Sequence, residues 1–353
     1  MGRSDQNANR ERCRFPQWHI PTYRVIDTGL QAPVIAGWSS MVKAGGPPGA
    51  CYNQCSPDRW TQYSRNAPKR LVAPPMISLN TLRMAAELLV YSAIFYGGLA
   101  LLVKGRSAFS DARRAVSDTR VNLSWAALDF ILVAPTLAFT VPLLQRVIDG
   151  LSLGIGPRAW SILPKAATFV AVIFIGDFVS YWRHRLEHTR LLWPTHAIHH
   201  SDTQMSWLTL SRFHPINRLV TSCVDVVVLG LLGFPAWALL ANEIVRHYYG
   251  EFIHADFPWT YGPVGRVFVS PAMHQWHHAR DVKAHDTNFA TVFSVFDQAF
   301  GTYIPGACTA PLGVDDNIGD SVTRQLLHPF VVWYGRIRNA FRRARPVVRV
   351  DLT

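Results

Sequence analysis

Eight histidines fall in three short stretches with repeated spacing. The first reads HRLEH from His184, the second reads HAIHH from His196, and the third reads HQWHH from His274. Twelve of the 14 histidines lie between residues 184 and 285 of the 353-residue chain. Packing does not explain such enrichment, and imidazole is a common metal ligand. The three stretches therefore predict a metal centre.

The spacing within each stretch indicates which histidines share a metal ion. On a helix, His184 and His188 are four residues apart and project from one face. In the other two stretches the first and second histidines are three residues apart, so we expect each such pair to share a face. The third histidine of each set, His200 or His278, points about 100° away from the second. That direction suits a second metal ion or the other side of a bimetal centre.

Apolar helices must position these histidines. Apolar regions run over about 84–103, 122–145, 160–182 and 216–253, and the first three approach the ~20 residues that a helix needs to cross a bilayer. Only 16% of the residues are charged, whereas about a quarter is typical of soluble domains. We therefore predict an all-α, integral-membrane, multi-pass helical bundle with about three spans.

Loop charges predict the orientation of these spans. Segment 104–120 carries five basic residues, whereas segment 147–159 carries only Arg158. The positive-inside rule places the first loop in the cytoplasm, and the third span then ends at His184 on the cytoplasmic side.

The fourth apolar region contains Gly233, Phe234 and Pro235 at its middle. A straight crossing would leave HAIHH and HQWHH on opposite sides of the membrane. We predict instead that the chain turns at this tripeptide and returns as a helical hairpin. Only this turn allows one cytoplasmic, histidine-rich helical cap that holds a dimetal centre.

The remaining composition sets the domain organisation. The net charge of +12 arises from basic residues at 65–70, 104–120 and 336–349, next to apolar runs; this is typical of membrane-flanking loops and indicates no nucleic-acid partner. The five scattered cysteines indicate no disulfide framework. Residues 1–75 lack apolar periodicity and are expected to be a disordered or non-native extension before a physiological start at Met76. We expect a catalytic domain over 76–305 and a basic tail over 306–353.

The three stretches resemble the HX3H, HX2HH, HX2HH pattern of the fatty acid hydroxylase and sterol desaturase superfamily of integral-membrane, non-haem di-iron enzymes. The flanking stretches LLWPTHAIHHSD, SRFHP, FIHADF, VSPAMHQWHH and NFATVFSVFDQAFGTY are similar to segments that family members carry in the same order. The resemblance covers about residues 84–303.

The resemblance implies that the eight matched histidines are metal ligands: His184, His188, His196, His199, His200, His274, His277 and His278. It also implies a ninth ligand, His254 in FIHADF. Three further residues, Asp177, His214 and His285, could orient ligand histidines or make purely structural contacts, and His214 and His285 could also bind the metal directly. His247 precedes His254 by two helical turns and could support the site or anchor its helix at the membrane interface.

The implied activity is oxidation of a membrane lipid with O2 as co-substrate and two iron ions (Fe2+/Fe3+) as cofactor, for which zinc could substitute. The dimetal centre itself would be catalytic, and the position of the lipid carbon would decide between hydroxylation and desaturation. No GxGxxG motif is present, so electrons must come from an external donor, a cytochrome b5-like haem protein or a ferredoxin with its reductase. The segment RIRNAFRRARPVVR could dock such a donor or bind anionic lipid head groups.

Two other classes of function stay open. Imidazole also suits zinc, so a zinc-dependent membrane hydrolase is one alternative, although no HEXXH pattern supports it. A metal-binding membrane protein without oxygenase activity is the other. The sequence does not distinguish sterols, fatty acyl chains, sphingoid bases, carotenoids and ether lipids as substrates.

Overall fold

The computed structural model describes residues 78–151, 153–154, 160 and 162–343. Every described residue belongs to the second of the two units into which the chain divides, Arg70–Thr353. The predicted extension over residues 1–75 lies outside the described residues, as does the end of the basic tail. The domain division at residue 305 stays a prediction.

Three apolar helical segments are long enough to cross a membrane. They are α2 (Leu79–Lys104), the continuous segment Val116–Gly150 and α7 (Lys165–Glu187). The second comprises α4 (Val116–Leu128), the π-helical turn η1 (Asp129–Val133) and α5 (Ala134–Gly150). These segments correspond to the first three apolar regions of the sequence, with different ends. The third begins at Lys165 rather than at residue 160 because Pro164 occupies its N-cap, and proline is unfavourable inside a helix.

The fourth apolar region forms two helices joined by a tight turn. α9 (Pro215–Leu231) ends just before the tripeptide Gly233-Phe234-Pro235, and α10 (Ala236–His254) begins just after it. Gly233 has φ 73°, a left-handed conformation that glycine adopts without steric cost, and Pro235 is the N-cap of α10. The predicted turn is therefore confirmed.

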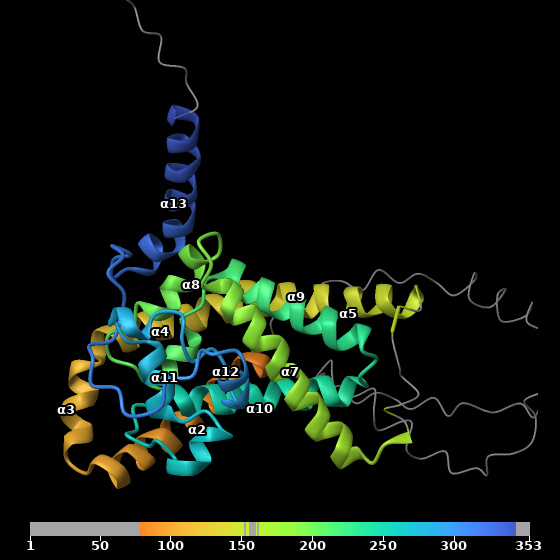
Figure 1. Cartoon of the computed structure of the whole chain (residues 1–353), viewed down its shortest axis with the longest axis horizontal. Helices are drawn as coiled ribbons and strands as arrows, with labels where there is room; N and C mark the ends of the chain where they lie inside the picture. The colour runs from red at the N-terminus through yellow and green to blue at the C-terminus, as the bar shows by residue number, and fades with distance from the viewer. Residues whose placement is uncertain (1–77, 152, 155–159, 161, 344–353) are drawn as a thin grey trace, which may run out of the picture. The chain divides into compact units, whose positions relative to one another are not determined.

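The two hairpin helices both pack against α7 (Figure 1). The crossing of α7 and α10 is close at Gly176, where an added Cβ would lie 2.3 Å from Oδ1 of Asn242. On the other side, α9 packs against α5. Buried apolar side chains, among them Val172, Leu229 and Phe234, fill the space between the three helices.

Short elements gather at one end of the long helices (Figure 1). They include α8 (Trp193–His200), α11 (Pro271–His277) and α12 (Val295–Ala299), with the 3-10 turns η2 (Trp207–Ser211), η3 (Gly262–Arg266) and η4 (Val282–Ala284). A short helix α3 (Ser107–Arg114) follows α2, and α13 (Val322–Arg343) packs against α8. The described part of the chain contains no β-strand beyond an isolated bridge between Ala279 and Leu312.

A second apolar cluster connects these short elements to the spans. Tyr181 of α7, Ile253 of α10, Met273 of α11 and Phe289 are buried together with Phe296 of α12. The cluster lies directly beside the histidine-bearing ends of the helices, so it fixes the positions of these ends relative to one another.

Candidate metal centre

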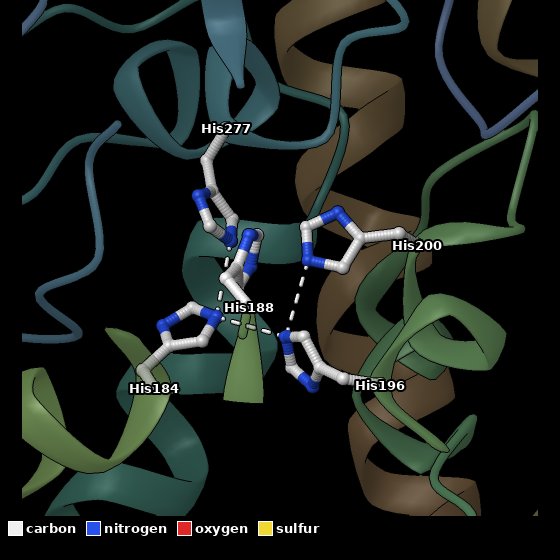
Figure 2. Close-up of side chains that lie close together, drawn as sticks. All are labelled: His184, His188, His196, His200 and His277. Atoms are coloured by element: carbon white, nitrogen blue, oxygen red, sulfur yellow. Dashed lines mark hydrogen bonds between the residues drawn. The ribbon is translucent and has the colours of Figure 1, made fainter. Parts of the chain in front are cut away.

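Nine buried or half-buried histidines form two neighbouring groups. The five-histidine group contains His184, His188, His196, His200 and His277, and the four-histidine group contains His199, His254, His274 and His278. Within each group one nitrogen of every ring lies within 4.8 Å of the others. Figure 2 shows the five rings converging from α7, α8 and α11. These nine residues are the nine for which the sequence predicted metal ligation.

The division between the groups differs from the sequence prediction in one respect. His196 shares a group with His200, not with His199, and His274 shares a group with His278, not with His277. The predicted pairing of residues three apart was therefore wrong. On a helix, residues four apart differ by about 40° in direction, whereas residues three apart differ by about 60°. The pair that is four apart therefore converges better on one point.

The hairpin brings the histidine of α10 back to those of α8 and α11. Nε2 of His254 lies 3.1 Å from Nε2 of His199 and 3.0 Å from Nε2 of His274. These contacts join segments that are 55 and 20 residues apart in the sequence. The turn at Gly233 is the feature that makes the four-histidine group possible.

The closest ring contacts in the five-histidine group have the geometry of shared coordination. Nε2 of His184 lies 3.0 Å from Nε2 of His196 and 3.0 Å from Nε2 of His277, and Nε2 atoms of His196 and His200 are 3.2 Å apart. Two nitrogens that each lie ~2.1 Å from one ion at a right angle are ~3.0 Å apart. The spacing therefore fits a metal ion between the rings.

The protonation states of His184 and His277 also indicate a metal ion between their Nε2 atoms. Nδ1 of His184 contacts the carbonyl of Phe289 at 2.7 Å, and Nδ1 of His277 contacts the carbonyl of Thr287 at 2.6 Å. Each Nδ1 must carry the proton to donate to a carbonyl, so in the neutral rings both Nε2 atoms are bare lone pairs. Two lone pairs 3.0 Å apart repel each other unless a cation lies between them.

Burial keeps the rings of the cap neutral. It lowers the pKa of six histidines well below the usual value, and neighbouring imidazoles lower it further; the six are His196, His199, His200, His274, His277 and His278. A neutral imidazole retains the lone pair that a metal ion requires. The site is therefore prepared for ligation near neutral pH.

Two carboxylates that sequence reasoning missed lie against the five-histidine group. Oε2 of Glu187 is 3.4 Å from Nδ1 of His196, and both side chains are 1% exposed. Oδ1 of Asp286 is 3.4 Å from Nδ1 of His188, but the Asp286 side chain is 74% exposed. Glu187 could have been found from its place inside HRLEH, whereas Asp286 carries no signal in the sequence. In metal sites, a carboxylate beside the ring nitrogen that does not bind the metal (the far nitrogen, here Nδ1) fixes the orientation of the ligand histidine and raises its basicity.

Asp177 acts on a loop rather than on a histidine ring or a neighbouring helix. Its carboxylate accepts hydrogen bonds from the backbone N–H groups of Thr291, Val292 and Phe293, at distances from 2.7 to 3.2 Å. The same loop carries Phe289, whose carbonyl receives the hydrogen bond from His184. Asp177 therefore holds the loop that orients His184.

Asp297 is a further residue that the sequence did not reveal. Its buried carboxylate accepts from the N–H groups of Phe289 and Ala290 at 2.7 and 3.1 Å and from the hydroxyl of Thr302 at 2.7 Å. Burial raises the pKa of Asp297 to about 7, against the lowering effect of these hydrogen bonds. Two buried carboxylates thus anchor the 287–293 loop, Asp297 at residues 289–290 and Asp177 at residues 291–293.

Three predicted histidines lie outside both groups. Nδ1 of His214 accepts the N–H of Ile216 at 3.2 Å as the N-cap of α9, and Nε2 contacts the carbonyl of Leu326 at 3.2 Å. His285 is exposed beside Asp286. His247 is half exposed, and its Nε2 lies 3.5 Å from Oε1 of Glu251.

Two cavities reach the histidines from different sides. The first, which we call the hairpin cavity, has a volume of about 100 Å³, lies between α7, α9 and α10, and touches His184, His196, His199, His254 and His274. The second, the mouth cavity, has a volume of about 470 Å³, lies among the short elements, and touches His188, His200 and His277. Ligands could therefore approach the two groups by separate routes.

Comparisons with known proteins agree with this geometry. Residues 169–302 match the fatty acid hydroxylase family model. The chain is 30% identical to the ornithine lipid hydroxylase OlsE of Rhizobium tropici over 177 residues, which are 49% of this chain and 53% of that protein. It is 27% identical to the alkylglycerol monooxygenase of Homo sapiens over 168 residues, 45% of this chain and 36% of that protein. No solved structure matches the chain.

A third relative is the very-long-chain aldehyde decarbonylase GL1-11 of Oryza sativa subsp. japonica, 27% identical over 151 residues, which are 40% of this chain and 54% of that protein. The chain thus spans about half of the length of these curated relatives, or less. The segment matched by the family model contains all nine histidines of the two groups. Residues 169–302 thus match a fatty acid hydroxylase domain, and these relatives belong to the superfamily that the histidine pattern resembles.

Proposed function

We propose that this protein is an O2-dependent oxidoreductase that hydroxylates or desaturates a membrane lipid at a histidine-ligated di-iron centre. The observation that carries the proposal is the pair of adjacent histidine groups at the end of a bundle of apolar helices. The names of the relatives, which include a lipid hydroxylase and a monooxygenase, support lipid oxidation.

We assign one iron ion to each group. The five-histidine group would hold one ion and the four-histidine group the other, with all nine histidines as ligands. An all-imidazole donor set leaves the charge of Fe(II) uncancelled, and paired irons supply the means to activate O2 toward an unactivated C–H bond. In hydroxylation, one oxygen atom enters the C–H bond and the other leaves as water, with two electrons and two protons from the donor; desaturation removes two hydrogens and yields two waters.

The protein would fix the directions of the ligand rings and the position of the lipid. Hydrogen bonds from His184 and His277 to backbone carbonyls fix the directions of their Nε2 atoms, and the carboxylate of Glu187 lies 3.4 Å from Nδ1 of His196. The hairpin cavity, between α7, α9 and α10, would hold the reacting end of the lipid near histidines of both groups.

We propose a multi-pass topology with the histidines on the cytoplasmic side. Lys104, at the end of α2, forms an ion pair with Asp111 at 2.9 Å and another with Asp256, just after the end of α10. The basic 104–120 loop therefore lies at the same end of the bundle as the histidines, and the positive-inside rule assigns this end to the cytoplasm.

An electron donor would then reach the centre through the mouth cavity. Three arginines, Arg190, Arg280 and Arg336, line this cavity beside the rings of His188 and His200. An acidic cytochrome b5-like protein or ferredoxin could dock there, with help from the basic end of α13. Neutralising Arg336 and Arg338 should then weaken the salt dependence of donor-supported turnover.

Metal analysis combined with O2 uptake tests the proposal. The full chain in nanodiscs should contain two irons per chain and should consume O2 when a donor, its reductase and extracted membrane lipids are supplied. Lipidomics of cells that express wild type or His277→Ala should show an oxidised lipid only with wild type. A redox-inactive zinc site with ester or amide hydrolysis would instead establish the hydrolase alternative.

A further inference from the structure

The hairpin cavity is lined by charged side chains although it lies between largely apolar helices of the proposed membrane bundle. Arg183 and Glu187 come from α7, Asp225 from α9 and Arg246 from α10. All four side chains are at least nine-tenths buried. Charged groups in such a position are costly and are expected to have a function.

The four side chains form one connected network. Nη1 of Arg183 donates to Oε1 of Glu187 at 2.7 Å, and its Nε lies 3.6 Å from Oδ1 of Asp225. Nη1 of Arg246 donates to Oδ2 of Asp225 at 3.0 Å. The hydroxyl of Thr221 joins the network, since it accepts from Arg183 at 3.0 Å and donates to Glu187 at 3.2 Å. The network thus runs from α10 across α9 and α7 to Glu187, which contacts His196.

The network leaves some hydrogen-bonding capacity unused beside the cavity. Nε of Arg246 has no hydrogen-bond partner among the described residues. Nε of Arg183 and Oδ1 of Asp225 also make no hydrogen bond but face each other at 3.6 Å, and Oε2 of Glu187 faces Nδ1 of His196 at 3.4 Å. Most buried polar groups in proteins are satisfied. Cationic and anionic groups that lie side by side and are incompletely hydrogen-bonded are complementary to a ligand that presents both charges.

The size of the hairpin cavity also favours a small polar ligand group. Its volume of about 100 Å³ is that of about three water molecules, which is room for a small polar group but not for a fused ring system. A hydrocarbon chain in this position would cover these charged groups without offering any of them a hydrogen bond. An apolar carbon is therefore disfavoured next to the histidines on this side.

We propose that the hairpin cavity binds a zwitterionic lipid head group, one that carries an ammonium and a carboxylate. Asp225 and Glu187 would bind the ammonium, and Arg246 and Arg183 the carboxylate. The histidines that touch the same cavity would then face carbons at the head-group end of the lipid. This inference rests on the proposed function for its reaction, but the binding step does not need a metal.

Binding to the metal-free, full-length protein tests the site. Native mass spectrometry would compare Nε-palmitoyl-lysine, which has a zwitterionic head, with methyl palmitate, which has the same acyl chain and no charge. We expect wild type to bind Nε-palmitoyl-lysine about tenfold more tightly or better. The double variant Asp225→Asn/Arg246→Gln keeps the net charge and should abolish this preference. The control Arg83→Leu/Glu87→Leu removes an exposed ion pair of α2 and should retain it.

Folding is monitored separately through thermal unfolding and the metal content of the reloaded protein. If the double variant does not fold, Thr221→Val removes only the bridging hydroxyl and should reduce the preference in part. Equal binding of both probes to wild type overturns the proposal, as does an unchanged preference in a folded double variant. If binding follows our expectation but the loaded enzyme oxidises neither probe nor extracted lipids, then the head-group site stands and the oxygenase function fails.

Discussion

The two histidine groups differ in how the protein holds their rings. In the five-histidine group, the far nitrogens of His184 and His277 are held by backbone carbonyls, and those of His196 and His188 lie 3.4 Å from carboxylates. In the four-histidine group, His254 alone has such a partner within the described part of the chain, the carbonyl of Gly250 at 2.6 Å. Nδ1 atoms of the other three rings have no hydrogen-bond partner among the described residues.

This difference predicts unequal metal sites. Rings whose far nitrogen is fixed are preorganised, and carboxylate partners make them better donors. The five-histidine group should therefore bind metal more tightly, and it has one ligand more. The four-histidine group should lose its ion first, and its rings can rotate more easily when substrate or O2 arrives at the hairpin cavity.

Removal of one ligand from each group gives the largest expected contrast. His274→Ala leaves three rings in its group and should eliminate one metal ion and all lipid oxidation. His188→Ala leaves four rings and removes the least buried member, so most of the metal should remain. Metal content per chain measures the difference, and His247→Ala, outside both groups, is the control. Equal metal loss in His188→Ala and His274→Ala would show that the two groups are equivalent.

Replacement of a carboxylate beside the five-histidine group should lower metal affinity more when that carboxylate is more deeply buried. Glu187→Gln should lower the metal affinity of that group by about 10- to 100-fold, because the buried carboxylate becomes a neutral amide beside His196. Asp286→Asn should have a much smaller effect, since solvent screens its exposed side chain. Competition with a chelator measures both affinities. A larger effect of Asp286→Asn would contradict the assigned order.

The sequence named the histidines that converge in the structure better than it divided them between the two groups. All nine histidines could be named because their spacing and the turn at Gly233-Pro235 leave few ways to unite them. The partition failed because a difference of about 20° in helical direction decides it, and tertiary approach must be known to judge that. The loop contacts of Asp177 and Asp297 span 116 and 8 residues at most. Backbone N–H groups are present at every residue, so no pattern of letters identifies which of them a carboxylate will bind.

Acidification should destabilise the metal-free protein through the rings of the four-histidine group whose Nδ1 atoms have no hydrogen-bond partner among the described residues. Burial lowers the pKa of His199, His274 and His278 below that of the unfolded chain, so the unfolded state binds more protons. The stability of the metal-free protein should thus be fully present above about pH 6.5 and be lost as the pH falls below it. His278→Asn should reduce this slope by up to about 1.4 kcal/mol per pH unit. Denaturant unfolding at several pH values measures it, and an unchanged slope would mean that this ring does not stay neutral.

Asp177→Asn has the smallest expected effect on metal affinity, and this effect should be confined to the five-histidine group. Asp177→Asn replaces one acceptor oxygen with an NH2 group that faces the N–H groups of Val292 and Phe293, which costs about 1–3 kcal/mol of stability. The displaced loop carries Phe289, so the hydrogen bond that orients His184 weakens. Metal affinity should fall in the five-histidine group by less than in Glu187→Gln, because Asp177 acts through a backbone segment, and the four-histidine group should keep its affinity. Chelator competition, read for each ion separately, tests this. Equal losses of metal affinity in both groups would mean that the 287–293 loop supports the whole centre. The different hydrogen-bond partners of the rings would then not produce two sites of different affinity.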